Sequence, residues 1–453
     1  MNRFDAILEQ TVGELPREAL RKWAAILFSL FVLTLQLSLA ASQAMLAAAG
    51  LLYAVYLLRA RPVVVRFLPV KLPLALFCLL SLVPIFWAEN SGVGWFAIRK
   101  LVLFIIWLLA VNLVLSTRHL LRLLQGTFAI ALFTSLVGIV QFVIQYRDVR
   151  AHHPGEMYLY LTTRRIHGLM GHWMNFGGQE MLVFAFLLAY LLLAAHRKSK
   201  FEIRNLKLED RIAPSEESAG TAESELRVSN FGSRAPPFWW TVMAFVCLAI
   251  LLNFTRGVWL GCFLAGIYLV ARWRPKWLWA LPVLLALGYV GAPSLIRERV
   301  YMALHPTQEL ALANRLEMWG VALRMIRAHP WVGVGPNNVE EDYPAYMPPG
   351  KTPELGYHNH FHNDFLQFAA ERGLPCLASW VWMMAALGWY TWKLRRRIAQ
   401  PWIADACFAA WLAFLAEGCF EFNFGTSPVL MAFLFFTSTP FIAACTSGGK
   451  LER

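Results

Sequence analysis

The sequence predicts an all-α polytopic membrane protein with about 12 transmembrane helices and a large extracytoplasmic loop subdomain containing amphipathic helices. Of the 453 residues, 58% are hydrophobic and only 15% are charged, and the mean hydropathy is +0.50. A soluble chain carries about 25% charged residues. The apolar residues are collected in runs long enough to cross a bilayer, and the short loops between these runs are basic.

The net charge of +13 raises the alternative of nucleic-acid binding. Lys and Arg, however, gather in short loops between apolar runs, which is typical of positive-inside topology, so no nucleic-acid partner is expected. The seven cysteines form no Cys-x-x-Cys pair and lie mostly in apolar runs, which argues against a disulfide scaffold or a zinc–thiolate site. No cleavable signal peptide is evident, because the first apolar run begins near Trp23 and is long enough to span.

The first transmembrane half covers residues 1–196 and contains about six spans. Its apolar runs lie at about 23–41, 43–58, 70–87, 97–115, 121–145 and 178–196, and an extracytoplasmic loop at 146–177 separates the last two. Residues 197–237 are rich in Ser, Glu and Arg and poor in aromatic residues. Such a segment buries too little apolar surface to fold, so we expect a disordered cytoplasmic linker.

The remaining spans form two groups around the second extracytoplasmic segment. Residues 238–292 contain spans 7–9, with runs at 238–253, 257–272 and 276–292, and residues 374–453 contain spans 10–12, with runs at 374–392, 402–422 and 427–445. The basic loops at 59–66, 116–122, 272–276 and 393–397 all fall on one side of this arrangement, together with both termini. The positive-inside rule makes that side cytoplasmic.

The segment between these groups, 293–373, is expected to form a large loop on the extracytoplasmic side, and it contains a histidine motif. Its stretch LANRLEMWGVALRMIRA places Leu312, Leu316, Trp319, Leu323 and Ile326 at helical spacing. These residues predict one face of an amphipathic helix that lies on the membrane surface or caps the bundle.

The stretch YHNHFHNDF in this loop concentrates the polar chemistry of the chain. On a strand, His358, His360 and His362 would share a face, whereas on a helix His358 and His362 would be neighbours. Metal binding is one reading, but the nearby carboxylates are few. A structural role is another, with Asn359 or Asn363 capping a helix. A third is a histidine that acts as a general base on a hydroxyl.

Arginines share this side of the membrane with the histidines. Arg164 and Arg165 lie in the medium loop, Arg256 lies in a short turn between two spans, and Arg315 lies on the amphipathic helix. An arginine near membrane depth is costly unless it meets an anion or a water-filled cavity, and guanidinium groups bind phosphate well. Solvated charges, a headgroup contact or a salt bridge are the structural alternatives. Convergence on an acidic, phosphorylated lipid substrate is the functional one, and no nucleotide-binding GxxxxGK[ST] motif is present.

These residues resemble the O-antigen ligase and O-antigen polymerase family of bacterial membrane glycosyltransferases. His362 and Asn363, a gap of nine residues and then Gly373 resemble the ligase signature. The family usually has Gly, Thr or Tyr three residues after that glycine, and this chain has Cys376 there.

Three more motifs precede the histidine in the order that the family shows. RIHGLMGHWMNFGG resembles the Arg-x-x-Gly and Asn-x-x-Gly loop, with Met174 where the family often has Pro. FTRG resembles the Ser-Arg or Thr-Arg turn, and NRLEMWGVALRMIRAHPWVGVGPNN resembles the segment before the histidine motif. The matching residues are Arg165, Gly168, Asn175, Gly178, Arg256, Arg315 and Trp319.

The resemblance implies an inverting transfer of a glycan from polyprenyl diphosphate to a sugar hydroxyl of lipid A-core. His362, Arg256 and Arg165 would be catalytic, and the substrate-binding residues would be Arg315, Asn363, Arg164, His360, His358 and Asn175. Because diphosphate is a good leaving group and arginines can offset its charge, no metal or other cofactor is expected. No obligate protein partner is inferred. The resemblance places the chain in the bacterial inner membrane, with its active site facing the periplasm.

Two alternatives stay open at this point. A polymerase of O-antigen or exopolysaccharide would carry the same motifs, and the spacing of His362 and Gly373 favours the ligase. A non-enzymatic transporter would place ionisable residues at mid-span and break its helices there. Here the charged residues cluster towards one membrane face, which favours an enzyme.

Overall fold

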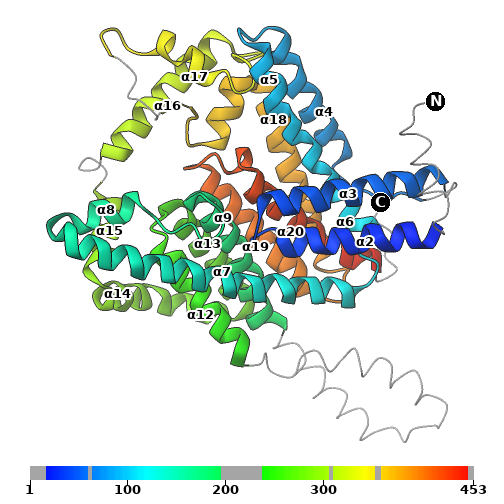
Figure 1. The fold of residues 1–453 in the computed structure, drawn as a ribbon, viewed down its shortest axis with the longest axis horizontal. Coiled ribbons are helices and arrows are strands. Elements are labelled where there is room, and N and C mark those ends of the chain that lie inside the picture. The colour runs from blue at the N-terminus through cyan, green and yellow to red at the C-terminus, as the bar shows by residue number, and fades with distance from the viewer. Residues whose placement is uncertain (1–16, 60–63, 195–236, 306–309, 352–358, 447–453) are drawn as a thin grey trace, which may run out of the picture.

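The computed structural model describes residues 17–59, 64–194, 237–305, 310–351 and 359–446 (Figure 1). Helices dominate these ranges, and no strand occurs within them. The predicted all-α class is therefore confirmed. Residues 197–236 of the expected linker and His358 lie outside the described residues.

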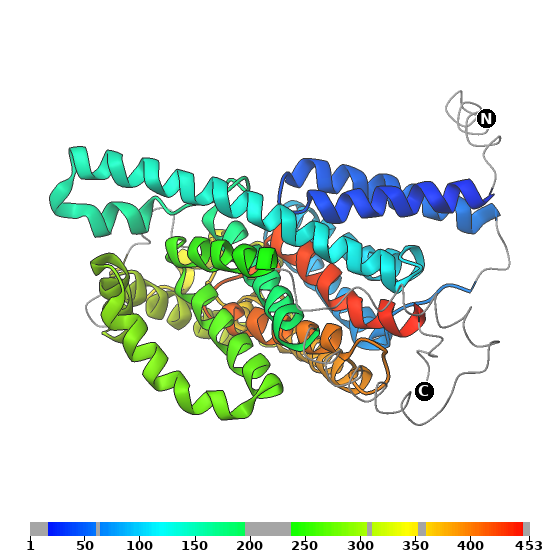
Figure 2. The same cartoon turned by 90° about the horizontal axis from the view of Figure 1, so that it is seen from below.

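Each apolar run of the first half corresponds to a helix or a chain of short helices. The elements are α2 (Arg17–Thr34), α3 (Leu39–Arg59), α4 (Lys71–Leu82), α5 (Ser91–Ile98), α6 (Ile105–Leu113), α7 (Thr117–His152), α8 (Met157–Thr163) and α9 (Trp173–Ala189). A helical turn at Arg99–Phe104 joins α5 to α6. In Figures 1 and 2, α2 and α3 lie side by side at one end of the molecule, and α7 runs along its length.

The second half contains the remaining helices. They are α12 (Pro237–Leu252), α13 (Arg256–Trp273), α14 (Leu281–Gly291), α15 (Ser294–Leu304), α16 (Leu310–Ala328), α17 (Val339–Asp342), α18 (Asp364–Leu394), α19 (Pro401–Gly418) and α20 (Ser427–Thr446). In Figure 1, α16 and α17 lie at the same end of the molecule as α5, and Asn338 before α17 contacts Asn90 before α5.

Five described helical segments have the length and apolar composition needed to cross a membrane. They are Leu39–Arg59, Ser91–Leu113, Thr117–His152, Trp173–Ala194 and Ser427–Thr446. Two shorter apolar helical segments, Lys71–Phe86 and Pro237–Leu252, accompany them. A polytopic helical membrane protein is supported, whereas the count of about 12 spans stays a prediction.

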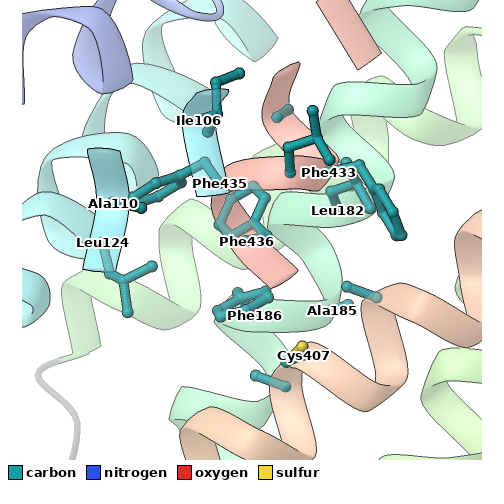
Figure 3. Packing of buried hydrophobic residues seen from close by; sticks show 14 of the residues in the cluster. Ile106, Ala110, Leu124, Leu182, Ala185, Phe186, Cys407, Phe433, Phe435 and Phe436 are labelled. Atoms are coloured by element: carbon teal, nitrogen blue, oxygen red, sulfur yellow. The ribbon is translucent and has the colours of Figure 1, made fainter. Parts of the chain in front are cut away.

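The core of the bundle forms where α20 and α9 pack against α6 and α19. Figure 3 shows Phe433, Phe435 and Phe436 of α20 among residues of these neighbours, and the rings of Phe436 and Phe186 are 4.4 Å apart. Within the apolar windows of α20 and α9, 89% and 83% of the residues are buried. A helix that is apolar on all sides and buried on all sides is central to a bundle, so these two helices provide the rigid support for the loops at their ends.

The amphipathic helix α16 exists, but its buried face differs from the predicted one. Leu316 and Leu323 are 58% and 47% exposed, while Met318, Val321 and Met325 are buried. These last three pack in a small second core with residues of the loop after α16 and with Phe361 beside the histidines. Turning this face inward lets Trp319 reach the histidine loop, where its Nε1 donates a hydrogen bond to the Phe361 carbonyl at 2.9 Å.

Helix α18 starts ten residues before the apolar run that was expected to begin at Leu374. Asp364 is its first residue, and the helix is kinked at Gly373, whose φ of 78° is in the left-handed region. The Trp331 carbonyl oxygen lies so close that a Cβ at Gly373 would approach it to 2.2 Å. The glycine is therefore required both for the backbone conformation and for the close approach of the preceding loop.

Candidate active site

His362, Glu421 and Arg315 form a connected group of side chains. The Nδ1 atom of His362 lies 2.7 Å from Oε2 of Glu421, and Arg315 forms an ion pair with Oε1 of the same carboxylate. An ionised carboxylate only accepts hydrogen bonds, so Nδ1 carries the proton and Nε2 presents its lone pair. His362 is thereby held in the tautomer that a general base requires.

The carboxylate of Glu421 is buried, but it remains ionised. Burial alone would raise its pKa, but the charge of Arg315 and the hydrogen bond from His362 outweigh that effect and lower the pKa to about 2. Only 3% of the side chain is exposed, so the Arg315 guanidinium and the Nδ1–H group of His362 replace the solvent that would otherwise stabilise the charge.

Two neighbouring residues fasten the histidine loop to the chain around Glu421. Asn363 caps α18 by accepting from the Leu366 N–H at 3.0 Å, and its Nδ2 donates to the Cys419 carbonyl at 2.8 Å. Asp364 accepts from the Phe424 N–H at 3.2 Å. Because these bonds lie on both sides of Glu421 along the chain, they bring the carboxylate to His362.

The backbone on the other side of His362 is held by buried polar groups. Phe361 is fully buried, and its N–H donates to Oε1 of Gln367 at 2.8 Å. His362 itself has a φ of 47°, a conformation that costs energy for a residue with a Cβ. The cap, the buried Phe361 and the Glu421 contact together impose this strained conformation, which is common at functional sites.

A second group forms where the loop carrying Arg165 meets the turn carrying Arg256. Asn253 is fully buried, and its Nδ2 donates to the carbonyls of Ile166 and Trp173 at 2.9 and 3.1 Å. A Cβ at Gly177 would approach Oδ1 of Asn253 to 2.6 Å, so the close contact needs a glycine. Asn253 thus ties the FTRG turn to the loop that begins with Arg165.

The two groups are close enough for their charges to act on one another. Burial lowers the pKa of Arg165 to about 9, with further lowering by the positive charges of Arg299, Arg315 and Arg256, and the carboxylate of Glu421 opposes the shift. Arg165 also donates to the Thr162 carbonyl at 2.7 Å and lies over the Trp173 ring at 3.9 Å. The positive charges of three other arginines thus act on Arg165, and a group of guanidinium groups of this kind suits an anionic ligand such as a phosphate.

Other residues predicted for the site occupy different positions. Arg164 is exposed and lies 6.0 Å from the Tyr160 ring, so of the two adjacent arginines it is Arg165 that joins the cationic group. The Oδ1 atom of Asn175 is buried and has no hydrogen-bond partner among the described residues. Asn363 is occupied by its capping and loop contacts.

Two further residues of the site, Glu421 and Arg299, belong to none of the motifs that the sequence predicts. Glu421 was predicted to lie at the end of an apolar run, and Arg299 lies in a helix that carried no motif. Arg299 is only 4% exposed, and it donates to the Phe254 carbonyl at 3.1 Å and to the Tyr158 hydroxyl at 3.2 Å. An ionisable residue at the end of an apolar run is by default a functional candidate, and this signal could have found Glu421.

His360 completes a set of groups that could hold a metal ion. One potential ligand atom from each of His360, His362 and Glu421, a ring nitrogen or a carboxylate oxygen, lies within 4.8 Å of the other two. The fit is poor, however, because both oxygens of Glu421 are already engaged by Arg315 and His362. A divalent cation would have to approach against the charge of Arg315, so the arrangement favours a metal-free site.

His360 should make the folded protein sensitive to mild acid. Burial, followed by the neighbouring His362, lowers the pKa of His360 to about 4, whereas an unfolded histidine titrates near pH 6.5. The unfolded chain therefore binds more protons between these values, and stability falls as the pH is lowered from about 6.5 to about 4. We expect the thermal midpoint of a His360→Gln variant in detergent to fall less over this interval than that of the wild type. If the thermal midpoints of the two proteins fell equally with pH, His360 would not be the source of the acid sensitivity.

Comparison with known proteins agrees with the motifs. A sequence model of the O-antigen ligase family matches residues 241–381, a range that includes Arg256, Arg299, Arg315 and His362. Arg165 and Glu421 lie outside the matched range. No curated protein matches the chain. The resemblance proposed from the sequence is thus confirmed over the matched residues.

Proposed function

Because residues 241–381 match the O-antigen ligase family, we propose that the chain transfers a glycan from polyprenyl diphosphate to a sugar hydroxyl of lipid A-core. The observation that carries the proposal is the 2.7 Å contact between His362 and Glu421, which leaves Nε2 of His362 as the proton acceptor beside a group of arginines. The reaction would take place at the periplasmic face of the inner membrane, with both termini in the cytoplasm.

In the proposed reaction His362 acts on the acceptor. Nε2 takes the proton of the acceptor hydroxyl while its oxygen attacks the anomeric carbon from the side opposite the diphosphate. Glu421 stabilises the imidazolium that results, because its carboxylate contacts Nδ1. The bond between the anomeric carbon and the diphosphate oxygen breaks, and the electron pair leaves with the diphosphate. The anomeric configuration is inverted.

The arginines act on the donor. Arg165 and Arg256 hold the diphosphate and offset the charge that grows on it as it leaves. Arg315 contributes to the same field while it holds Glu421. Arg164, at the exposed edge of this region, and the unpartnered amide oxygen of Asn175 are further candidate contacts of the substrates.

The function is tested by complementation in two Gram-negative hosts, one lacking its O-antigen ligase and one lacking its O-antigen polymerase. Each host receives the wild type, the variant Arg256→Lys or the control variant His305→Asn. The control is chosen because the side chain of His305 is exposed and lies outside the site. We expect the wild type and His305→Asn to restore the lipopolysaccharide ladder in the ligase-deficient host. Arg256→Lys should lower the amount of lipopolysaccharide in the ladder by about 10- to 100-fold, because lysine lacks the planar guanidinium group that binds two phosphate oxygens at once. Longer chains in the polymerase-deficient host alone would assign polymerase activity instead.

Removal of divalent cations should leave the reaction intact. The cationic side chains around Glu421 provide the charge that a metal supplies in other phosphate-releasing enzymes. Purified protein treated with EDTA and assayed for glycan transfer should retain its rate to within about twofold. Loss of activity that Mg²⁺ or Mn²⁺ restores would contradict this expectation.

A further inference from the structure

A cavity of about 450 Å³ opens between the last turns of α7, with the chain that follows them, and the start of α15. The first segment contributes Tyr146, Glu156 and Tyr158 to its lining, and α15 contributes Ser294 and Glu298. The volume lies within the range of about 300–1,000 Å³ that is common for pockets binding small molecules. These tyrosine, glutamate and serine residues line the cavity together with the apolar Met157, Leu159 and Leu295, so it offers both polar and apolar contacts to a ligand.

The cavity adjoins the cationic group through Arg299. Tyr158 lines the cavity, and its hydroxyl accepts a hydrogen bond from Nη1 of Arg299 at 3.2 Å. Nε of the same arginine donates to the Phe254 carbonyl at 3.1 Å, two residues before Arg256. The charge of Arg299 also acts on Arg165. One buried arginine therefore separates the cavity from the proposed diphosphate site.

The lining has the chemistry of a site for a sugar ring. Tyrosine presents an apolar face against which the C–H groups of a ring can pack, together with a hydroxyl for hydrogen bonding. The carboxylates of Glu156 and Glu298 are exposed and form no ion pair or hydrogen bond with other described residues, so they are available to sugar hydroxyl or amine groups. Their negative charge opposes the binding of phosphate or of an acidic sugar.

We propose that this cavity is a subsite for a neutral or amino sugar ring of one of the two glycan substrates. The inference rests on the proposed glycan transfer, because it extends the diphosphate site by one glycan-binding position. A lipid-linked donor would reach the cavity with the sugars that follow its diphosphate. An acceptor would reach it with core sugars away from the reacting hydroxyl.

The test compares Glu298→Gln with Glu340→Gln in the full-length protein held in lipid nanodiscs. Gln preserves the size of the side chain and removes its charge, and Glu340 is an exposed glutamate outside the cavity. Three probes are titrated: polyprenyl diphosphate without sugar, the same lipid carrying an N-acetylhexosamine disaccharide, and core oligosaccharide released from lipopolysaccharide. Unchanged affinity for the bare lipid shows that the variant is folded.

We expect Glu298→Gln to lower the affinity for one of the two sugar-bearing probes by about tenfold. This is the effect of losing a hydrogen bond to a charged group. Glu340→Gln should leave all three affinities unchanged. A selective loss with the lipid-linked disaccharide assigns the subsite to the donor, and a selective loss with core oligosaccharide assigns it to the acceptor. Equal affinities of the wild type and Glu298→Gln for both sugar probes would overturn the subsite. Failure of the wild type to bind the bare lipid would instead count against the proposed function.

Discussion

Replacing His362 by asparagine is expected to lower glycan transfer by about 10²- to 10⁴-fold, the range that a general base contributes. Asparagine cannot take a proton from a hydroxyl at neutral pH. It does tolerate the left-handed backbone conformation that His362 adopts, with φ 47°, better than alanine does. The measurement is the initial rate of transfer by purified protein with saturating donor and acceptor.

The control for this variant is His305→Asn. His305 follows α15, in the same segment between α14 and α18 as His362, and its Nδ1 contacts only the local Tyr301 carbonyl among the described residues. Its replacement should leave the rate unchanged. If His362→Asn kept more than about a tenth of the wild-type rate with its thermal midpoint intact, the histidine would not be the base.

The second large effect is expected from Glu421→Gln. The change removes the charge that orients His362 and stabilises its protonated form, so the rate should fall by about 10²- to 10⁴-fold. It also leaves Arg315 partly buried without its counter-charge, since Arg315 pairs with Glu421 in the folded protein. Removing one partner of a buried pair costs about 3–5 kcal/mol of stability. Transfer rate and thermal unfolding are measured on the same preparations.

A double variant separates the two consequences. Glu421→Gln combined with Arg315→Met removes the uncompensated charge, so part of the stability should return while the transfer rate stays low. Glu317→Gln is the matched control, because Glu317 also forms an ion pair, with Lys351 at 2.6 Å, but outside the site. Recovery of the rate together with stability in the double variant would show that Glu421 has a structural role alone.

The nine residues around the three histidines illustrate what a motif can and cannot say. The pattern predicted a proton acceptor, a metal site or a helix cap. Asn363 is the cap, and His362 is the histidine that contacts a carboxylate. His360 instead lies beside His362, with their ring centres 4.2 Å apart. Only the three-dimensional course of the loop distinguishes these positions, because each histidine has the same titratable ring.

Helix α16 shows the same limit for packing. Its apolar residues extend around much of the helix, so spacing alone allowed more than one buried face. The loop after α16 and Phe361 selected the face with Met318, Val321 and Met325. That choice places Trp319 against the Phe361 carbonyl and Arg315 against Glu421.

The sequence by itself determined the membrane class, the helical fold and the short motifs around Arg165, Arg256, Arg315 and His362. These properties depend on composition and on residues close together in the chain, which a linear pattern records. The tertiary structure alone decided that Glu421, 59 positions after His362, is its partner. It also decided that Arg299, 45 positions after Phe254, donates a hydrogen bond to the carbonyl of Phe254 in the FTRG turn. Such contacts form only when distant helices pack, because nothing in the local sequence specifies which buried charge will meet which partner.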